Sequence, residues 1–366
     1  PYLAGNLGSG TPKEMRDWVE YCNFPGGSTL SDERIANGAT EPFGIQFWGV
    51  GNENWGCGGN FSPEDYCTEY RRFSTYLRAW GGTKPFLIAC GPSSNDATWT
   101  RRFFEKLKND FWSGGPIHGY AAHHYCGSES TAIEFEPEHW TQLLVNANKM
   151  EELVVDQRKL MDEYDPEGKI GLIVDEWGAW HRATPGTNPA YLWQQSTQRD
   201  AVVAGLTFDI FNRHADKVVM ANLAQTINVL QSLLLTDGGK MVKTPTYHVF
   251  DLYRPHMGAQ SLTVRCEGPS AAEGLPLVAG SASTLDGKTT VTLTNQGLEP
   301  VEVRIVAPGQ GWSADAVLPA DGDVHSHNTF ERPDAVSLVS LPAPAAEQDG
   351  CTVVLAPGAV ARVRSA

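Results

Sequence analysis

The chain of 366 residues is longer than one ordinary domain, so its length predicts two domains and a large buried core. Its 43 acidic and 28 basic residues give a formal net charge of −15, and no run of Lys or Arg interrupts this balance. This charge argues against a nucleic-acid backbone or an anionic membrane as partner and favours a neutral substrate.

The cysteines and the apolar stretches bear on the cellular compartment. The seven cysteines are scattered and form no CxxC pair, a pattern that favours a reduced, cytoplasmic setting. No stretch reaches the roughly 18 apolar residues of a membrane span, and no signal segment opens the chain. The chain does not begin with Met, so we expect its native start to lie upstream.

Strand and helix patterns alternate over roughly the first 255 residues. Six strands are expected, over residues 1–5, 45–50, 86–90, 120–124, 170–176 and 218–222. Helices are expected from residue 11, and over residues 62–80, 98–108, 137–164 and 188–214. The clearest helix has Ser62 as N-cap and an apolar stripe from Tyr66 to Trp80. This alternation predicts a parallel sheet with helices outside it.

Beyond about Pro255 the helical spacing disappears and short alternating runs replace it. These runs cover residues 262–266, 289–294, 301–305, 336–341 and 351–355. Asp286-Gly287 is a hairpin signal between two strands, and the whole region predicts an antiparallel β-sandwich. The chain is therefore expected to divide into a catalytic (β/α) barrel, residues 1–255, and a β-sandwich domain, residues 256–366.

Two glutamates end two of the expected strands. Glu53 lies in Gly51-Asn52-Glu53-Asn54-Trp55, and Glu176 lies in Asp175-Glu176-Trp177. The carboxyl ends of the strands of a parallel barrel open on one face, so these side chains are expected to converge. One protonated and one ionised carboxyl group are what glycoside cleavage requires.

Other polar and aromatic side chains share these strand ends, and polar groups among indole rings suit a sugar. They are Asn6, Asn52, His123, Tyr125, Asn222, Gln225, Trp48, Trp55, Trp177 and Trp180. Taken singly, each has an ordinary structural explanation: a strand-end carboxylate is commonly capped, and His123 alone is more often a core histidine. The hypothesis of a sugar-cleaving site therefore rests on the occurrence of all these residues together at the strand ends.

Other kinds of site have weaker support. His123 and His124 are adjacent and point to opposite faces of a strand, so they cannot easily bind one metal ion. The glycine-rich segment of residues 56–60 lacks the lysine of a phosphate-binding loop. A Schiff-base aldolase would need a strand-end lysine, which the six expected strands lack. We therefore expect no metal and no organic cofactor.

Three segments resemble glycoside hydrolase family 51, the α-L-arabinofuranosidases. They are residues 47–56 (FWGVGNENWG), 173–178 (IVDEWG) and 221–229 (ANLAQTINV), and residues 4–10 and 244–250 fit the same family. The resemblance implies an α/β fold, a (β/α)8 TIM barrel with a C-terminal antiparallel β-sandwich. It also implies retaining hydrolysis of arabinofuranosyl links, with Glu53 as general acid/base and Glu176 as nucleophile.

The same resemblance implies a substrate-binding set. Its members are Asn6, Asn52, His123, Tyr125, Trp180 and Gln225. Asn52 would hold the 2-hydroxyl of the sugar, a contact that tightens in the transition state. Tyr125 would steady the nucleophile, and His123 would line the pocket.

The resemblance also implies how much of the barrel this chain contains and which partners it has. Only six of the family's eight strand–helix units are found, so we expect an N-terminally incomplete barrel that further chain or a separate polypeptide completes. The expected partner is an arabinose-containing oligosaccharide or polysaccharide, in hemicellulose degradation and L-arabinose metabolism, and the resemblance implies a homo-oligomer, often a hexamer. The alternatives are a β-glucan or xylan hydrolase of the same fold and a non-catalytic carbohydrate-binding fragment.

Overall fold

The computed structural model describes residues 1–109 and 116–366. The chain forms two compact units. The first comprises Pro1–His123, Leu153–Asp175 and Lys217–Met220, and the second comprises His124–Glu152, Glu176–Asp216 and Ala221–Ala366. The domain boundary expected between residues 255 and 256 stays a prediction.

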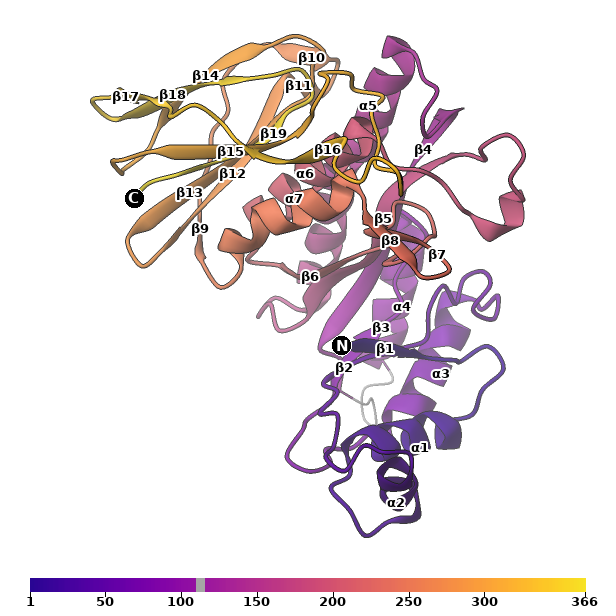
Figure 1. Cartoon of the computed structure of the whole chain (residues 1–366). Coiled ribbons are helices and arrows are strands. Elements are labelled where there is room, and N and C mark those ends of the chain that lie inside the picture. The colour runs from indigo at the N-terminus through magenta and orange to yellow at the C-terminus, as the bar shows by residue number, and fades with distance from the viewer. Residues whose placement is uncertain (110–115) are drawn as a thin grey trace. The chain divides into compact units, whose positions relative to one another are not determined.

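A six-stranded sheet has a spatial order that follows the chain from β1 to β6 (Figure 1). The strands are β1 (Tyr2–Gly5), β2 (Phe47–Val50), β3 (Phe86–Ala89), β4 (Gly119–Thr131), β5 (Gly171–Arg182) and β6 (Val218–Leu223). The pairs from β1 to β4 are parallel. The six strands expected from the sequence are therefore confirmed, although β4 and β5 continue several residues beyond the expected ends.

The apolar side chains on one face of this sheet form a small core. Ile88, Ala121 and Ile173 are buried there, and the ring of Tyr2 packs against them. A Cβ atom at Gly119 would lie within 3.0 Å of the side chains of Ile173 and Ile88, so the absence of a side chain lets the strands approach. This face supports the strand ends that carry the polar residues.

Four helices belong to the first unit (Figure 1). They are α1 (Pro12–Asn23), α2 (Thr29–Ala36), α3 (Pro63–Ser74) and α4 (Ala97–Asn109). Thr11 and Glu14 form the capping box that starts α1, as the sequence indicated, whereas α2 was not expected. The expectation that α3 continues to Trp80 is wrong. The hydroxyl of Thr75 donates to the carbonyl of Arg71 and competes with the backbone at that point.

One helix start after β5 also differs from expectation. The helix expected from residue 188 begins ten residues later: Asn188 caps only the 3-10 turn η2 (Pro189–Tyr191), and Leu192 then adopts a left-handed φ of 54°. α6 (Gln198–Arg213) follows Thr197, which forms a capping box with Asp200. The long helix α5 (Pro137–Tyr164) matches its expected range.

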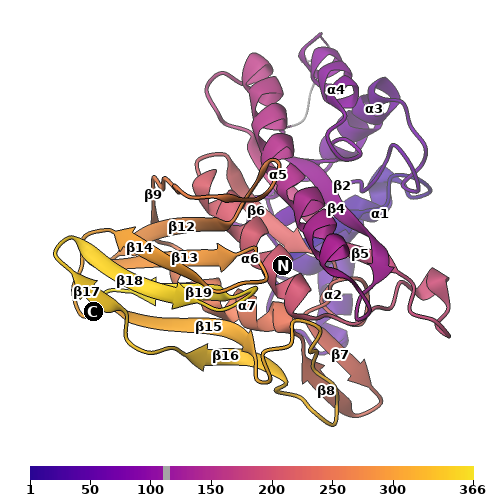
Figure 2. The same ribbon diagram turned by 90° about the horizontal axis from the view of Figure 1, so that it is seen from above.

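Two antiparallel sheets form the sandwich of the second unit (Figure 2). The larger has the order β16 (Val336–Ser340), β15 (Ser313–Pro319), β19 (Val360–Arg364), β13 (Lys288–Asn295), β12 (Val278–Leu285) and β9 (Gln260–Leu262). The smaller has the order β14 (Val301–Val306), β18 (Gly350–Leu355) and β17 (Ala345–Glu347). Short hairpins pair β7 (Leu234–Asp237) with β8 (Lys240–Lys243) and β10 (Ser270–Ala272) with β11 (Leu275–Pro276). The sandwich is as expected, but the strand expected over residues 262–266 ends at Leu262.

The larger sheet buries both of its faces. Along β13, Val291 and Leu293 belong to the apolar core of the sandwich, whereas Thr292 and Thr294 alternate with them and donate to Asp209 of α6. α6 also contacts α7 (Pro245–Tyr253). None of the helices in the described part of the chain is long and apolar enough to cross a membrane. All seven cysteines are free thiols.

Candidate active site

Glu53 lies in a turn directly after β2 that requires unusual backbone angles. Gly51 has a φ of 99° and Glu53 a φ of 45°, a left-handed conformation that glutamate rarely adopts. A Cβ atom at Gly51 would lie 2.0 Å from Oδ1 of Asn54, so glycine is needed there. The hydroxyl of Tyr66 donates to the carbonyl of Val50 at 2.6 Å and holds the end of the strand. Strained residues of this kind concentrate at functional sites.

Each carboxylate oxygen of Glu53 has its own partner. Nδ1 of His123 lies 3.1 Å from Oε1, and the thiol of Cys57 donates to Oε2 at 3.1 Å. The hydrogen bond with His123 lowers the pKa of Glu53 most strongly; partial burial opposes this, and the contact with Cys57 lowers the pKa further. In this state the surroundings of Glu53 favour the ionised carboxylate.

His123 connects Glu53 to a second carboxylate. Its Nε2 lies 3.0 Å from Oδ1 of Asp175, and the hydroxyl of Tyr2 donates to Oδ2 of Asp175 at 2.8 Å. His123 and Asp175 are buried, with 7% and 9% of their surface exposed. Both ring nitrogens of His123 thus face carboxylate oxygens. Sequence reasoning missed Asp175 and Tyr2; the available signal was an acidic residue directly after an apolar strand, a position where burial requires a partner.

The second unit holds Glu176 and its surroundings. The hydroxyl of Tyr125 donates to Oε2 of Glu176 at 2.7 Å. Trp180 packs edge-on against Tyr125, with 5.2 Å between ring centroids, and 40% of its surface is exposed. A carboxylate beside a solvent-facing indole can meet both the reactive carbon and the apolar face of a sugar.

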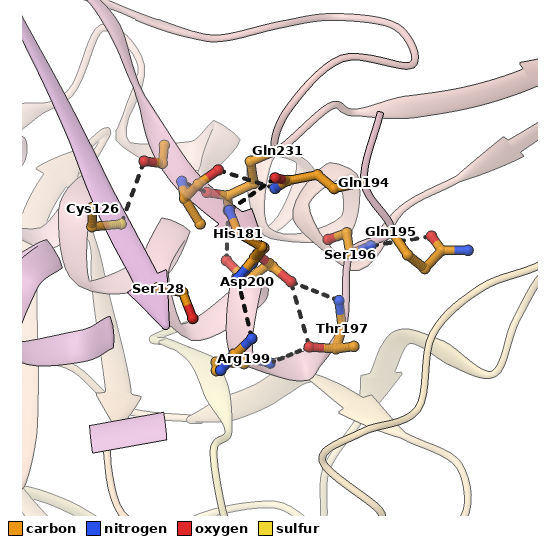
Figure 3. A network of polar contacts seen from close by, with 12 residues as sticks. Cys126, Ser128, His181, Gln194, Gln195, Ser196, Thr197, Arg199, Asp200 and Gln231 are labelled. Atoms are coloured by element: carbon orange, nitrogen blue, oxygen red, sulfur yellow. Dashed lines mark hydrogen bonds and ion pairs between the residues drawn. The ribbon is translucent and has the colours of Figure 1, made fainter. Parts of the chain in front are cut away.

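Buried side-chain amides hold β5 just beyond Glu176 (Figure 3). Oε1 of Gln231 accepts from the backbone N–H of Ala179 at 2.7 Å, and the amide of Gln194 donates to the carbonyl of the same residue at 3.0 Å. Gln194 also accepts from the N–H of His181 at 3.0 Å. Side-chain hydrogen bonds therefore hold both the N–H and the carbonyl of Ala179, and they fix the strand that carries Glu176 and Trp180.

A buried carboxylate with a histidine partner completes this network (Figure 3). Nε2 of His181 lies 2.8 Å from Oδ1 of Asp200, and Arg199 approaches Nδ1 of His181 at 3.2 Å. Burial alone would raise the pKa of Asp200, but His181, Arg199 and the backbone N–H of Thr197 lower it overall. The ionised Asp200 thus ties the start of α6 to the end of β5.

The remaining site residues named from the sequence occupy less defined positions. Asn6 is exposed and holds its own turn: Oδ1 accepts from the N–H of Ser9 and the amide donates to the Ser9 hydroxyl at 2.8 Å. Gln225 is exposed, and its backbone N–H donates to the carbonyl of Val229. Asn52 is half-buried in the turn beside Glu53. Their roles in substrate binding stay predictions.

Two family models match the chain. The α-L-arabinofuranosidase 1 domain matches residues 7–137, and the α-L-arabinofuranosidase C-terminal domain matches residues 175–358. The chain is 36% identical over 343 residues to an intracellular exo-α-L-arabinofuranosidase of Bacteroides ovatus, covering 92% of this chain and 66% of that protein. It is 37% identical to the GH51 arabinofuranosidase of Xanthomonas axonopodis pv. citri, with a TM-score of 0.90 over 99% of this chain and 75% of that chain. The chain belongs to the α-L-arabinofuranosidases of glycoside hydrolase family 51.

The comparisons also confirm the expected fold class. The sheet with its outer helices and the antiparallel sandwich are those of a GH51 TIM barrel with a C-terminal β-sandwich. A more distant structure, the bifunctional glucanase-xylanase CelM2, shares the fold at a TM-score of 0.61 and 11% identity. The fold therefore accommodates several chemistries, and the choice among them depends on the site. The chain spans about two thirds of the Bacteroides relative's length.

Proposed function

We propose that this chain carries the catalytic machinery of a retaining, exo-acting α-L-arabinofuranosidase. The observation that supports this most is that each strand-end glutamate has a dedicated partner, His123 for Glu53 and Tyr125 for Glu176, in a chain of this family. The relatives from Bacteroides ovatus and Streptomyces lividans are named intracellular exo-α-L-arabinofuranosidases, the latter with (1→5) specificity. The substrate would be a terminal α-L-arabinofuranosyl residue of an arabinose-containing glycan.

The reaction would proceed by double displacement. Glu176 attacks the anomeric carbon while Glu53 gives its proton to the departing glycosidic oxygen, and a covalent arabinofuranosyl ester on Glu176 forms. Glu53 then takes a proton from water, whose oxygen displaces Glu176 and restores the original anomeric configuration. Asn52 would hold the 2-hydroxyl and Trp180 and Gln225 the rest of the sugar. Retention requires the two carboxyl groups to lie about 5 Å apart during catalysis.

The acid role of Glu53 requires a proton that the free protein disfavours. The hydrogen bond from His123 lowers the pKa of Glu53, and burial is the factor that raises it. A bound sugar would displace water and bury Glu53 further, which shifts the carboxyl group towards its protonated form. Substrate binding and protonation of Glu53 are thus coupled in this proposal.

Hydrolysis of an aryl α-L-arabinofuranoside tests the proposal, with an aryl β-xyloside and carboxymethyl cellulose as competitors. We expect turnover of the arabinofuranoside, its loss in Glu176→Ala, and a severe loss in Glu53→Gln on substrates with poor leaving groups. Turnover of carboxymethyl cellulose alone would favour the glucanase alternative. Equal rates for the unaltered chain and Glu176→Ala would favour a non-catalytic carbohydrate-binding protein.

We also propose an intracellular location and a homo-oligomeric assembly. The location follows from the names of the two bacterial relatives, and the assembly follows only from the family resemblance. Light scattering of the purified chain, alone and with any upstream segment of its gene product, measures the assembly. A monodisperse monomer in both samples would contradict it.

A further inference from the structure

Glu53 is the last member of a row of polar side chains that runs into the interior of the first unit. The row comprises Tyr2 of β1, Asp175 of β5, His123 of β4 and Glu53 after β2. Successive contacts measure 2.8 Å from the Tyr2 hydroxyl to Oδ2, 3.0 Å from Oδ1 to Nε2, and 3.1 Å from Nδ1 to Oε1. The four side chains come from four different strand segments, so the packing of the sheet sets their spacing.

Asp175 is an unusual residue to bury in such a position. Its Oδ2 accepts the Tyr2 hydroxyl, but its Oδ1 is buried without a well-aligned hydrogen bond from any described residue. The donor nearest to Oδ1 is Nε2–H of His123, at 3.0 Å. A buried carboxylate with an incompletely satisfied oxygen destabilises the fold, and such groups occur in native proteins where they have a catalytic or similar role. Hydrogen bonds at catalytic groups are often poorly aligned before substrate binds.

The number of protons in the row limits its states. An ionised Asp175 with Tyr2 on one oxygen keeps a proton on Nε2 of His123, because two unprotonated acceptors 3.0 Å apart would repel each other. One further proton then lies between Nδ1 and Oε1. It resides either on His123, beside an ionised Glu53, or on Glu53, beside a neutral His123. The two arrangements have the same net charge.

We propose that Asp175 is a positioning residue that, through His123, keeps this shared proton available to Glu53 for donation to the leaving oxygen. The inference rests on the proposed function and adds to it the group that supplies the acid with its proton. In the first step the proton leaves Oε1 for the glycosidic oxygen, which takes the electron pair of the breaking C–O bond. In the second step a water proton returns to Oε1, while Nε2–H stays on Asp175 throughout.

Two thiols of the described residues face this row. The thiol of Cys57 contacts the other oxygen of Glu53. Burial raises the pKa of the Cys90 thiol, at the end of β3, and the charges of Asp175 and Glu53 raise it further. Cys90 is therefore neutral. Glu176 follows Asp175 directly in the chain. Glu176 belongs to the second unit.

Asp175→Asn tests the proposal by removing the charge while conserving the shape. Without that negative charge the Glu53–His123 pair holds its proton less tightly, so the alkaline limb of kcat/KM should move to lower pH by about one unit. The loss of activity should also depend on the leaving group. We expect about a tenfold or greater loss for an alkyl α-L-arabinofuranoside and a much smaller loss for an aryl arabinofuranoside whose phenol leaves without protonation.

Two further variants control for simple destabilisation. Asp165→Asn alters another buried aspartate of the first unit, which accepts the backbone N–H of Ile170 at 2.6 Å, and should leave the alkaline limb in place. Tyr2→Phe removes a hydrogen-bond donor from Asp175. The negative charge of Asp175 is then less compensated, so the Glu53–His123 pair holds its shared proton more strongly. The alkaline limb should then move slightly to higher pH, opposite to Asp175→Asn.

The outcomes separate this inference from the proposed function. If Glu53→Gln shows the leaving-group dependence but Asp175→Asn lowers all rates equally at every pH, Asp175 is only structural and the inference fails. If Asp175→Asn does not fold, Tyr2→Phe provides the test instead. An alkaline limb of kcat/KM that does not move in Tyr2→Phe then overturns the inference. If Glu53→Gln itself shows no leaving-group dependence, the proposed function fails first.

Discussion

The two candidate catalytic glutamates have different hydrogen-bond partners. Glu53 has a histidine nitrogen and a thiol on its two oxygens, whereas Glu176 accepts the hydroxyl of Tyr125. A nucleophile needs an oriented, ionised oxygen, and a phenol donor supplies orientation without competing for the role of acid. An acid/base must change its protonation state twice in each cycle, and a titratable histidine partner suits that task.

Tyr125→Phe should lower kcat while leaving the fold intact. A hydrogen bond to a charged group contributes about 1.5–3 kcal/mol, so its loss from Glu176 should lower kcat by about 10- to 100-fold. Steady-state kinetics with an aryl arabinofuranoside measures the effect. Tyr191→Phe is the matched control, because Tyr191 lies in the same unit and is 73% exposed. An unchanged kcat in Tyr125→Phe would show that this hydroxyl does not assist Glu176.

Cys57→Ala should move the alkaline limb of kcat/KM upward. The thiol lowers the pKa of Glu53 by donating to Oε2, although less than His123 does. Glu53 must be protonated for the first step, so a variant without that donor keeps its proton to higher pH. The pH profile measures the shift. Cys266→Ala, which alters another exposed thiol, should not move the limb; a downward shift in Cys57→Ala would contradict the assignment.

At the scale of elements, helix starts were easier to predict from the sequence than helix ends. Thr11 and Ser62 cap the first residues of α1 and α3 through their own side chains, so the signal is local. The end of α3 was wrong because Leu77 is buried as the helical spacing suggested, yet it lies outside the helix. Burial depends on tertiary packing. Apolar residues three or four positions apart therefore indicate which side chains are buried, but they do not establish that the backbone there is helical.

The strand ends show the same division between local and tertiary information. Glu53 and Glu176 could be found because each ends an apolar run that a parallel sheet buries. The row from Tyr2 to His123 could not, because its members are brought together by the order β1 to β6. The extension of β5 to Arg182 depends likewise on Gln194 and Gln231, which lie far along the chain.

Asp200→Asn should strongly destabilise the second unit. It weakens the buried hydrogen bond with His181 and one half of the α6 capping box, and a hydrogen bond to a charged group contributes about 1.5–3 kcal/mol. Urea unfolding at pH 7 measures the loss. The exposed pair of Asp323 with His325 is the control: Asp323→Asn should change the free energy of unfolding by less than about 1 kcal/mol. Equal effects would show that the buried network adds nothing.

The lowered pKa of Asp200 also predicts a pH dependence. The folded-state pKa of Asp200 is lowered, so its contribution to stability is present above the unfolded pKa of about 3.9 and is lost as the pH falls through the folded value. The destabilisation caused by Asp200→Asn should therefore shrink in strongly acidic solution. Unfolding at pH 3 and pH 7 compares the two regimes.

At the scale of the whole molecule, the second unit joins helices to its sandwich through polar contacts as well as apolar ones. Asp209 of α6 is fully buried, and its oxygens accept hydroxyls from Ser281, Thr292, Thr294 and Tyr253. The packing of α6 is close because Gly205 faces β13 and β19; a Cβ there would lie 2.8 Å from Thr294 and from Val360. The sequence predicted the sandwich, but no pattern along the chain indicated this helix–sheet contact.

Asp209 should make the second unit less stable as the pH rises from about 4 to 6. Burial raises the pKa of Asp209 to about 6, against the opposing effect of the hydroxyl donors. The folded chain therefore holds a proton that the unfolded chain, with a pKa of about 3.9, has released, and the free energy of unfolding falls with rising pH over this window. Two units of pKa difference correspond to at most about 3 kcal/mol.

Asp209→Asn removes this titration, so the free energy of unfolding of the unaltered chain relative to the variant should be higher at pH 4.5 than at pH 7. Urea unfolding at both values, followed by a signal from the sandwich, measures the difference. Asp251→Asn alters a half-exposed aspartate of α7 and should leave the pH dependence unchanged. Parallel pH profiles for the unaltered chain and Asp209→Asn would mean that the four hydroxyls already keep Asp209 ionised. The contact between α6 and the sandwich would then involve a buried charge that destabilises the fold equally at both pH values.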